Sequence, residues 1–379
     1  MPSAIRRAIG QLLIGSFPST TIPAELRSLA REFGLGGVIL FARNIEEPGQ
    51  VAELARDLQS LGGELPLWVS VDQEGGRVAR LRAPFTKWPP MATLGRSGDE
   101  RLASRFAAAL AAELSAVGIT LDYAPVLDIH TNAKNPVIGD RALAEDAETV
   151  GRLGAAIIRG LQDNGIAACG KHFPGHGDTS ADSHFELPVV EHPPDRIRRV
   201  EFVPFREAIK ANVAFIMTAH VLVPSFDEHN PATLSRTIVH GLLRGELGYE
   251  GVILSDDLEM RALAATYTVP DAAVEAIAAG CDGVLVCRHL VQDRAHDVDA
   301  QVQVLEALIH AVEDERIPYG RIEDALTRQR RAKERFLAAP TFAAHSVTTG
   351  HAGRKGQPYR EVVGCDAHRQ IAEEMARYL

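Results

Sequence analysis

The stretch AACGKHFPGHGDTSADSHFELP, residues 167–188, joins an apolar run to a segment dense in ionisable side chains. Two glycines and a proline follow directly after Phe173, and these residues disfavour a helix. So many ionisable groups would also be costly to bury without partners. The pattern therefore predicts a strand that ends near Phe173, followed by a loop that holds reactive side chains above a cavity.

Asp182 and His184 are separated by one residue in this loop. At that spacing an aspartate can accept a hydrogen bond from one imidazole nitrogen, and the other nitrogen stays free to exchange a proton with a substrate. A blander interpretation is that Asp182 caps a turn and His184 is a solvated loop histidine. The polar residues nearby favour the catalytic interpretation; they are Lys171, His172, His176 and Asp178.

The composition limits the number of domains and the kinds of partner that this chain can have. The 379 residues are 46% hydrophobic, and 40 Lys plus Arg stand against 50 Asp plus Glu, which gives a net charge of −10. That length supports one large domain or two modest ones. An acidic chain without a basic block argues against nucleic acid or an anionic membrane surface as a partner.

The cysteines and the N-terminus indicate the compartment. Cys169, Cys281, Cys287 and Cys365 show no paired spacing typical of a zinc ribbon or a disulfide framework. The first twenty residues lack the pattern of a secretory signal, and no apolar stretch approaches the length of a membrane span. We expect reduced thiols and a cytoplasmic protein.

Short apolar runs alternate with segments of helical periodicity along the chain. Eight runs read as strands: 11–17, 37–41, 66–72, 119–128, 167–173, 213–219, 251–255 and 283–287. The helical segments are 23–33, 101–117, 145–164, 203–211, 238–246, 270–279, 301–313 and 321–337. Eight buried strands alternating with helices predict a single (β/α)8 barrel rather than an open doubly wound sheet.

Polar residues at the C-terminal ends of these runs support the barrel, because barrel enzymes build their active sites there. These residues are Asp72, Asp128, Lys171 with His172, His220 and Asp256. An open sheet would instead concentrate them at one switch point. We predict a catalytic domain over residues 1–340. Residues 341–379 then form a C-terminal tail that is partly extended or disordered and can end in a short helix.

The run GVILSDDLEM, residues 251–260, ends in the adjacent aspartates Asp256 and Asp257. Burying two carboxylates at a strand end is expensive, which disfavours a purely structural role for both. One of them is expected to cap the following helix. In a retaining glycosidase, a carboxylate attacks the anomeric carbon while an acid protonates the departing oxygen. Asp256 is the candidate nucleophile, and the loop dyad is the candidate acid and base.

Six motifs in consistent order resemble family 3 glycoside hydrolases, and more narrowly the NagZ-type β-N-acetylglucosaminidases. The motifs are VDQEGGRVAR (71–80), APVLDI (124–129), NPVIGDRAL (135–143), KHFPGHGDTSADSH (171–184), MTAH with PATLS (217–220 and 231–235) and SDDLEM (255–260). The resemblance spans about residues 8–337. KHFPGHG with a downstream DSH is its most specific part.

The resemblance implies a retaining exo-hydrolase that removes terminal β-linked N-acetylglucosamine through a covalent glycosyl-enzyme. It implies Asp256 as nucleophile and His184 as acid and base, with Asp182 orienting the histidine. The implied sugar-binding residues are Asp72, Arg80, Arg141, Lys171 and His172. It also suggests a small muropeptide-derived carbohydrate as substrate, in cytoplasmic cell-wall recycling, with no metal or other cofactor. For the oligomeric state we favour a monomer.

A β-glucosidase of the same family is one alternative, since it would share Asp256 and much of the barrel; the DSH loop points to N-acetylglucosamine instead. Because the dyad lies on a glycine-flanked loop, we predict that residues 174–184 move to bring His184 to the glycosidic oxygen.

Two alternatives come from other classes. A metal-dependent hydrolase would gather His172, His176, Asp178 and His184 as ligands, although their spacing does not match a helix-borne HExxH motif or a thiolate site. A sugar-binding barrel without activity would need an absent nucleophile, whereas Asp256 is present.

Overall fold

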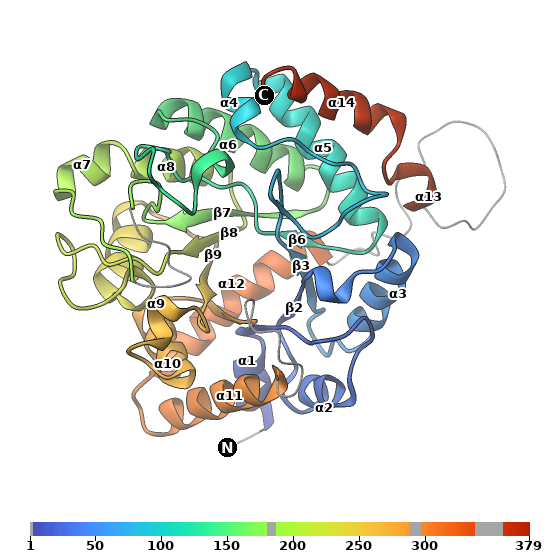
Figure 1. The fold of residues 1–379 in the computed structure, drawn as a ribbon. Helices are drawn as coiled ribbons and strands as arrows, with labels where there is room; N and C mark the ends of the chain where they lie inside the picture. The colour runs from blue at the N-terminus through green and yellow to red at the C-terminus, as the bar shows by residue number, and fades with distance from the viewer. Residues whose placement is uncertain (1–2, 180–186, 288–296, 338–358) are drawn as a thin grey trace.

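The computed structural model describes residues 3–179, 187–287, 297–337 and 359–379. Within them, eight parallel strands close into a barrel in the order β1-β10-β9-β8-β7-β6-β3-β2 (Figure 1). This confirms the predicted (β/α)8 fold. The strands are β1 (Leu13–Gly15), β2 (Gly37–Leu40), β3 (Trp68–Val71), β6 (Leu121–Asp122), β7 (Ala167–Phe173), β8 (Phe215–Thr218), β9 (Val252–Asp257) and β10 (Gly283–Val286).

Strand β7 has the predicted bounds, whereas β6 is much shorter than the predicted run 119–128. Pro125 has no amide hydrogen to donate to a neighbouring strand, so regular pairing stops before it. Beyond the proline, Val126 makes one isolated bridge to Lys171. The chain therefore stays beside β7 without forming a longer strand.

Large side chains fill the barrel interior, where Trp68 packs edge-on against Phe215 at a centroid distance of 5.3 Å. A second apolar layer lies between the strands and the surrounding helices. Those helices are α2 (Ala24–Phe33), α3 (Pro48–Gln59), α5 (Glu100–Ala116), α6 (Ala147–Gln162), α8 (Phe202–Lys210), the π-helix η4 (Thr237–Glu246), α10 (Val269–Ala279), α11 (Asp297–Glu313) and α12 (Tyr319–Leu337).

Side-chain caps fix where the central helices begin. Asp99 accepts hydrogen bonds from the backbone N–H groups of Arg101 and Leu102 at the start of α5, and Asp146 does the same for Thr149 in α6. Helix α3 is absent from the predicted elements, although Val51, Leu54, Ala55 and Leu58 give it a buried face. None of the described helices is both long and apolar enough to cross a membrane.

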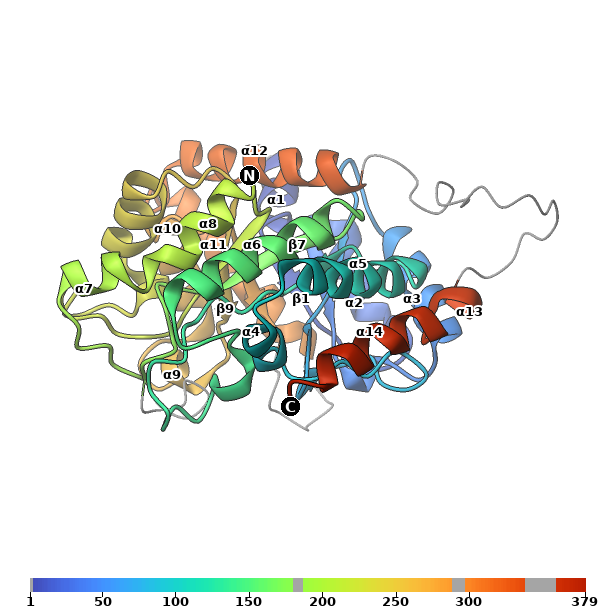
Figure 2. The same ribbon diagram turned by 90° about the horizontal axis from the view of Figure 1, so that it is seen from above.

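Further elements lie at the two ends of the barrel. Helices α1 (Ser3–Gly10) and α12 pack together, and α12 lies on the opposite side from α9 (Arg261–Ala264) in Figure 2. An antiparallel hairpin of β4 (Gln73–Gly75) and β5 (Val78–Ala79) follows β3. The remaining elements are α4 (Ala92–Ser97), α7 (Pro194–Arg199) and the 3-10 turns η1 (Ala42–Asn44), η2 (Gly139–Arg141) and η3 (Ala232–Leu234).

The end of the chain returns to the barrel. Helices α13 (Tyr359–Val362) and α14 (Asp366–Ala376) pack against α5, and the end of α14 lies beside α4 (Figures 1 and 2). The part of the predicted tail before Tyr359, residues 341–358, lies outside the described residues.

Candidate active site

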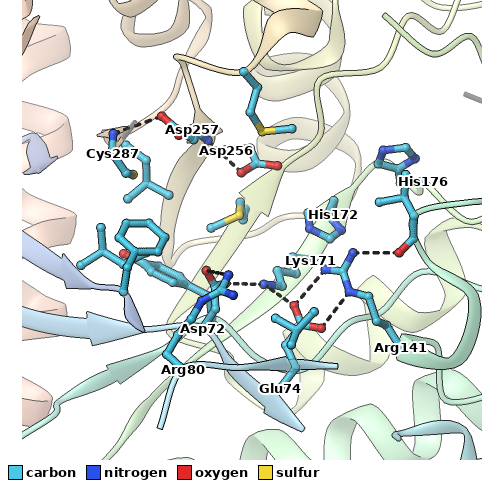
Figure 3. A pocket seen from close by; sticks show the side chains of 18 residues that line it. Asp72, Glu74, Arg80, Arg141, Lys171, His172, His176, Asp256, Asp257 and Cys287 are labelled. Carbon is cyan, nitrogen blue, oxygen red and sulfur yellow. Dashed lines mark hydrogen bonds and ion pairs between the residues drawn. The ribbon is translucent and has the colours of Figure 1, made fainter. Parts of the chain in front are cut away.

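A cavity of about 170 Å³ opens at the C-terminal ends of the barrel strands (Figure 3). Its apolar walls include Ile39, Phe41, Met217, Met260 and Leu285. Six of the sequence-predicted site residues line it: Asp72, Arg80, Arg141, Lys171, His172 and Asp256. Asp182 and His184 fall in the segment 180–186, outside the described residues, as does the end of the loop predicted to move.

Glu74 joins the predicted cations into one network, and it is missing from the sequence-predicted site. Its carboxylate accepts two hydrogen bonds from the Arg141 guanidinium, at 2.8 and 2.9 Å. Its Oε1 also lies 2.7 Å from Lys171 Nζ. Lys171 Nζ donates in addition to Asp72 Oδ1 at 2.8 Å, and Asp72 Oδ2 pairs with Arg80 at 3.4 Å (Figure 3).

The β4–β5 hairpin carries Glu74 between Asp72 and Arg80. The backbone N–H of Gln73 donates to Asp122 Oδ1 on β6 at 2.9 Å, which fixes the start of the hairpin. The Gln73 side-chain Oε1 accepts from the backbone N–H groups of Arg80 and Leu81, which fixes its end. The hairpin turn needs glycine at 75 and 76, because both have positive φ angles, 103° and 56°.

These contacts hold the ion pairs charged at neutral pH. Burial alone would raise the pKa of Glu74, but Arg141 and Lys171 more than offset it and lower that pKa to about 2. For Lys171, burial would lower the pKa, yet Asp72 and Glu74 raise it above its ordinary value. The network therefore presents fixed charges to whatever enters the cavity.

Asp256 lies at the end of β9, on the opposite side of the barrel from β3. Its Oδ1 accepts a hydrogen bond from the backbone N–H of Asp257 at 2.8 Å. Burial would raise the pKa of Asp256, but His220, His172, this hydrogen bond and Lys171 together lower it below its usual value. Asp256 is therefore an ionised carboxylate at neutral pH.

Asp257 has a structural role, although it differs from the expected one. Its Oδ1 accepts from the backbone N–H groups of Glu259 at 3.2 Å and Cys287 at 3.1 Å, which ties β9 to the end of β10. The prediction that one aspartate caps the next helix is wrong, because α9 begins after Met260 without a side-chain cap.

Asp128 and His220, two of the predicted strand-end residues, form hydrogen bonds with other residues of the site. Asp128 is fully buried and lies 2.7 Å from Nδ1 of His172, and it also accepts the backbone N–H of His176 at 2.6 Å. His220 Nε2 lies 2.9 Å from the backbone oxygen of Asp257. A backbone oxygen only accepts, so this nitrogen carries the proton. Asp128 and His220 therefore orient residues of the cavity wall.

The described part of the loop after β7 is tied to its surroundings. His176 Nδ1 lies 2.7 Å from Thr179 Oγ1, and burial lowers the pKa of His176 to about 4, so its ring is neutral. Asp178 accepts from Thr131 Oγ1 at 2.7 Å and lies 2.5 Å from His192 Nε2.

Three of the four candidate ligands of a metal-dependent hydrolase lie within the described residues. His172, His176 and Asp178 each have a separate partner rather than a shared centre. Across the part of the chain that the structure describes, no three His, Cys, Asp or Glu side chains are grouped to hold a metal ion. Its fourth candidate ligand, His184, lies in the segment 180–186.

Comparison with known proteins places the chain in a family. The family model for the glycosyl hydrolase family 3 N terminal domain matches residues 4–332. A beta-hexosaminidase from Thiobacillus denitrificans is 43% identical over 276 residues, which is 71% of this chain and 76% of that protein.

Solved structures agree with this match. A family 3 beta-N-acetylglucosaminidase from Paenibacillus sp. superposes with a TM-score of 0.88 at 41% identity, covering 99% of this chain and 68% of that one. NagZ from Neisseria gonorrhoeae, in complex with N-trifluoroacetyl-D-glucosamine, gives 0.76 at 30% identity, with 97% of both chains covered. The resemblance in the sequence is therefore confirmed, and the chain belongs to glycosyl hydrolase family 3.

Proposed function

We propose that the protein is a retaining exo-β-N-acetylglucosaminidase that removes terminal β-linked N-acetylglucosamine from small glycans. One observation carries the proposal: an ionised Asp256 shares a small cavity with the fixed charges of Asp72, Glu74 and Lys171. The cavity is smaller than the roughly 300 Å³ at the lower end of drug-sized ligand sites, which suits one sugar ring. The NagZ relative with a bound N-acylated glucosamine supports this choice of sugar.

The charged residues bind the sugar and hold it above Asp256. An ammonium group has three donors, and Asp72 and Glu74 use two of those on Lys171, which leaves one for a sugar hydroxyl. Asp72 and the guanidinium groups of Arg80 and Arg141 supply further acceptors and donors for hydroxyls or the acetamido group. His172, held by Asp128, lines the same cavity beside Lys171 and Asp256 (Figure 3).

The reaction proceeds in two steps. Asp256 attacks the anomeric carbon while His184 gives a proton to the departing glycosidic oxygen, which leaves a covalent glycosyl-enzyme. His184 then takes a proton from water, and the hydroxide displaces Asp256. Asp182 orients the imidazole. A neutral or cationic histidine suffers less repulsion from Asp256 than a second carboxylate would.

We infer that the glycans are muropeptides released during cell-wall recycling, handled in the cytoplasm. The NagZ-type motifs and the NagZ structural neighbour support the substrate. Free thiols at Cys169, Cys281, Cys287 and Cys365 fit a reducing compartment.

The decisive experiment compares hydrolysis of p-nitrophenyl β-GlcNAc and the matching β-glucoside by wild type, Asp256→Ala and His184→Ala. We expect a preference for GlcNAc and a loss of roughly a thousandfold or more in kcat/KM for Asp256→Ala. His184→Ala should lose less on this activated leaving group than on a natural disaccharide.

Three outcomes would overturn parts of the proposal. A preference for the glucoside would make the protein a β-glucosidase. Loss of activity on exhaustive chelation would favour a metal-dependent hydrolase. A slow fluorinated substrate that labels a residue other than Asp256 would refute the nucleophile.

A further inference from the structure

Helices α13 and α14 lie on the outside of the barrel, against α5 (Figure 1). They take no part in the proposed chemistry, and the matching family model ends at residue 332, before them. Their contacts with the barrel nevertheless include a buried charge, Glu113.

Glu113 lies on α5 and is 2% exposed. Its carboxylate accepts from the backbone N–H of Thr86 at 3.0 Å and from the Thr86 hydroxyl at 2.6 Å. From the C-terminal segment it accepts the backbone N–H of Gly364 and Nδ1–H of His368, both at 2.9 Å. Burial would raise the pKa of Glu113, but these hydrogen bonds lower it, so the group is ionised at neutral pH. One carboxylate thus joins two segments that are far apart in the sequence.

Gly364 makes the second contact between the same two segments. Its φ angle is 61°, and a Cβ atom there would lie 2.1 Å from the backbone oxygen of Pro84. The C-terminal segment therefore sits directly on the backbone that precedes Thr86.

Residues 84–91 in turn support the hairpin of the active site. The Trp88 ring packs edge-on against Phe106 of α5 at 5.0 Å, and the Trp88 carbonyl accepts the backbone N–H of Gly76 at 3.1 Å. A Cβ atom at Gly75 would lie 2.7 Å from Cε of Met91. A Cβ atom at Gly76 would lie 2.9 Å from Cα of Pro90. The hairpin that carries Glu74 thus rests on the segment that Glu113 holds.

We propose that Glu113 is a positioning residue, which transmits the docking of the C-terminal helices through Thr86 and Trp88 to the β4–β5 hairpin and so sets sugar affinity. The proposal rests on the proposed function, because it assigns sugar contacts to Asp72 and Arg80 at the ends of that hairpin. Asp256 lies across the barrel on β9. Loosening the hairpin should therefore weaken sugar binding more than it slows the chemical step.

Kinetics on p-nitrophenyl β-GlcNAc test the positioning role. We expect Glu113→Gln, Thr86→Val and Gly364→Ala to raise KM by about tenfold while kcat stays within about twofold of wild type. Thr86→Ser keeps the hydroxyl and should restore the wild-type KM. The matched control is Glu100→Gln on the same helix, where the side chain is 45% exposed and pairs with Arg152; its KM should not change.

Hydrogen exchange separates this inference from the proposed function. Because the Gly76 N–H bonds to Trp88, amides in residues 73–80 should exchange roughly tenfold faster in Glu113→Gln and Gly364→Ala, with β9 unchanged. This readout needs no substrate, so an inactive wild type with faster exchange would refute the function and retain the coupling.

Two results would overturn the coupling. One is wild-type exchange in residues 73–80 of both variants. The other is a lower rate at unchanged KM, which indicates only a smaller folded fraction.

Discussion

Replacing Glu74 by glutamine tests whether the ion pairs of the cavity are as enclosed as their geometry indicates. The Glu74 side chain is 1% exposed, between Lys171 at 3% and Arg141 at 10%. Glutamine keeps the shape of the side chain and removes its charge. Arg141 would then lose its carboxylate partner, and Lys171 would keep only Asp72, which also pairs with Arg80. Leaving buried cations with less negative charge is costly in a site with little water.

The expected loss of stability in Glu74→Gln follows from the pKa of Glu74. Burial, the largest effect, opposes ionisation, but Arg141 and Lys171 lower the pKa from 4.5 to about 2. That difference corresponds to roughly 3 kcal/mol of stability at neutral pH. Glu74→Gln should lower the free energy of unfolding by about that amount. The exposed Glu100–Arg152 pair is the control, since Glu100→Gln should cost under about 1 kcal/mol.

The stability that Glu74 contributes should depend on pH, in a direction set by its lowered pKa. A depressed pKa in the folded state gives stability that is complete above the unfolded pKa of 4.5 and is lost as the pH falls toward about 2. The difference between wild type and Glu74→Gln should therefore shrink across that window and stay constant above it.

Urea unfolding followed by tryptophan fluorescence measures this difference, because Trp68 and Trp88 are both buried. The same variant should show a raised KM, since Lys171 and Arg141 lose their shared anchor. A loss of less than about 1 kcal/mol would refute the reasoning, because an enclosed charge cannot be removed so cheaply. An equal loss at neutral pH and at the acid end of the window would refute it as well.

Three further predictions concern other parts of the barrel. Burial raises the pKa of Asp122 from 3.8 to about 7, and its Oδ2 has no hydrogen-bond partner among the described residues. Wild type should therefore lose stability relative to Asp122→Asn as the pH rises from 3.8 to about 7. Urea unfolding of both proteins across that range measures this loss, and a difference in unfolding free energy that does not change with pH would contradict the prediction. Gly177→Ala should lower the melting temperature clearly, because its Cβ would lie 1.7 Å from the Ile129 carbonyl; an unchanged melting temperature would argue against that contact. Ellman's reagent should label half-buried Cys365 in the native protein, and buried Cys169, Cys281 and Cys287 only after unfolding; burial raises the pKa of Cys281 to about 12.

The barrel itself could be predicted from the sequence, because its strands are buried on both faces and appear as continuous apolar runs. Residues 167–173 show this best, since the predicted and observed bounds agree. The run 119–128 shows the limit: its apolar residues are buried, but Pro125 interrupts the pairing that would make them a strand.

The cavity could be predicted in part, because Asp72, Lys171 and Asp256 lie within two residues of a strand end. Glu74 could not, since its partners Arg141 and Lys171 are 67 and 97 residues away. Strands β4 and β5, of 3 and 2 residues, are also too short to show periodicity. A faint signal existed in VDQEGG, where two acidic residues precede a pair of glycines. The contact between Glu113 and His368 spans 255 residues and has no local signal.

Strands β3 and β6 are neighbours in the barrel, and the β4–β5 hairpin is inserted in the chain between them. The inside of the barrel is packed by other residues, such as Trp68 and Phe215. A change of the partly exposed Arg80 side chain could therefore alter sugar preference without repacking the barrel interior, whereas Glu74, Gly75 and Gly76 are held by their close contacts.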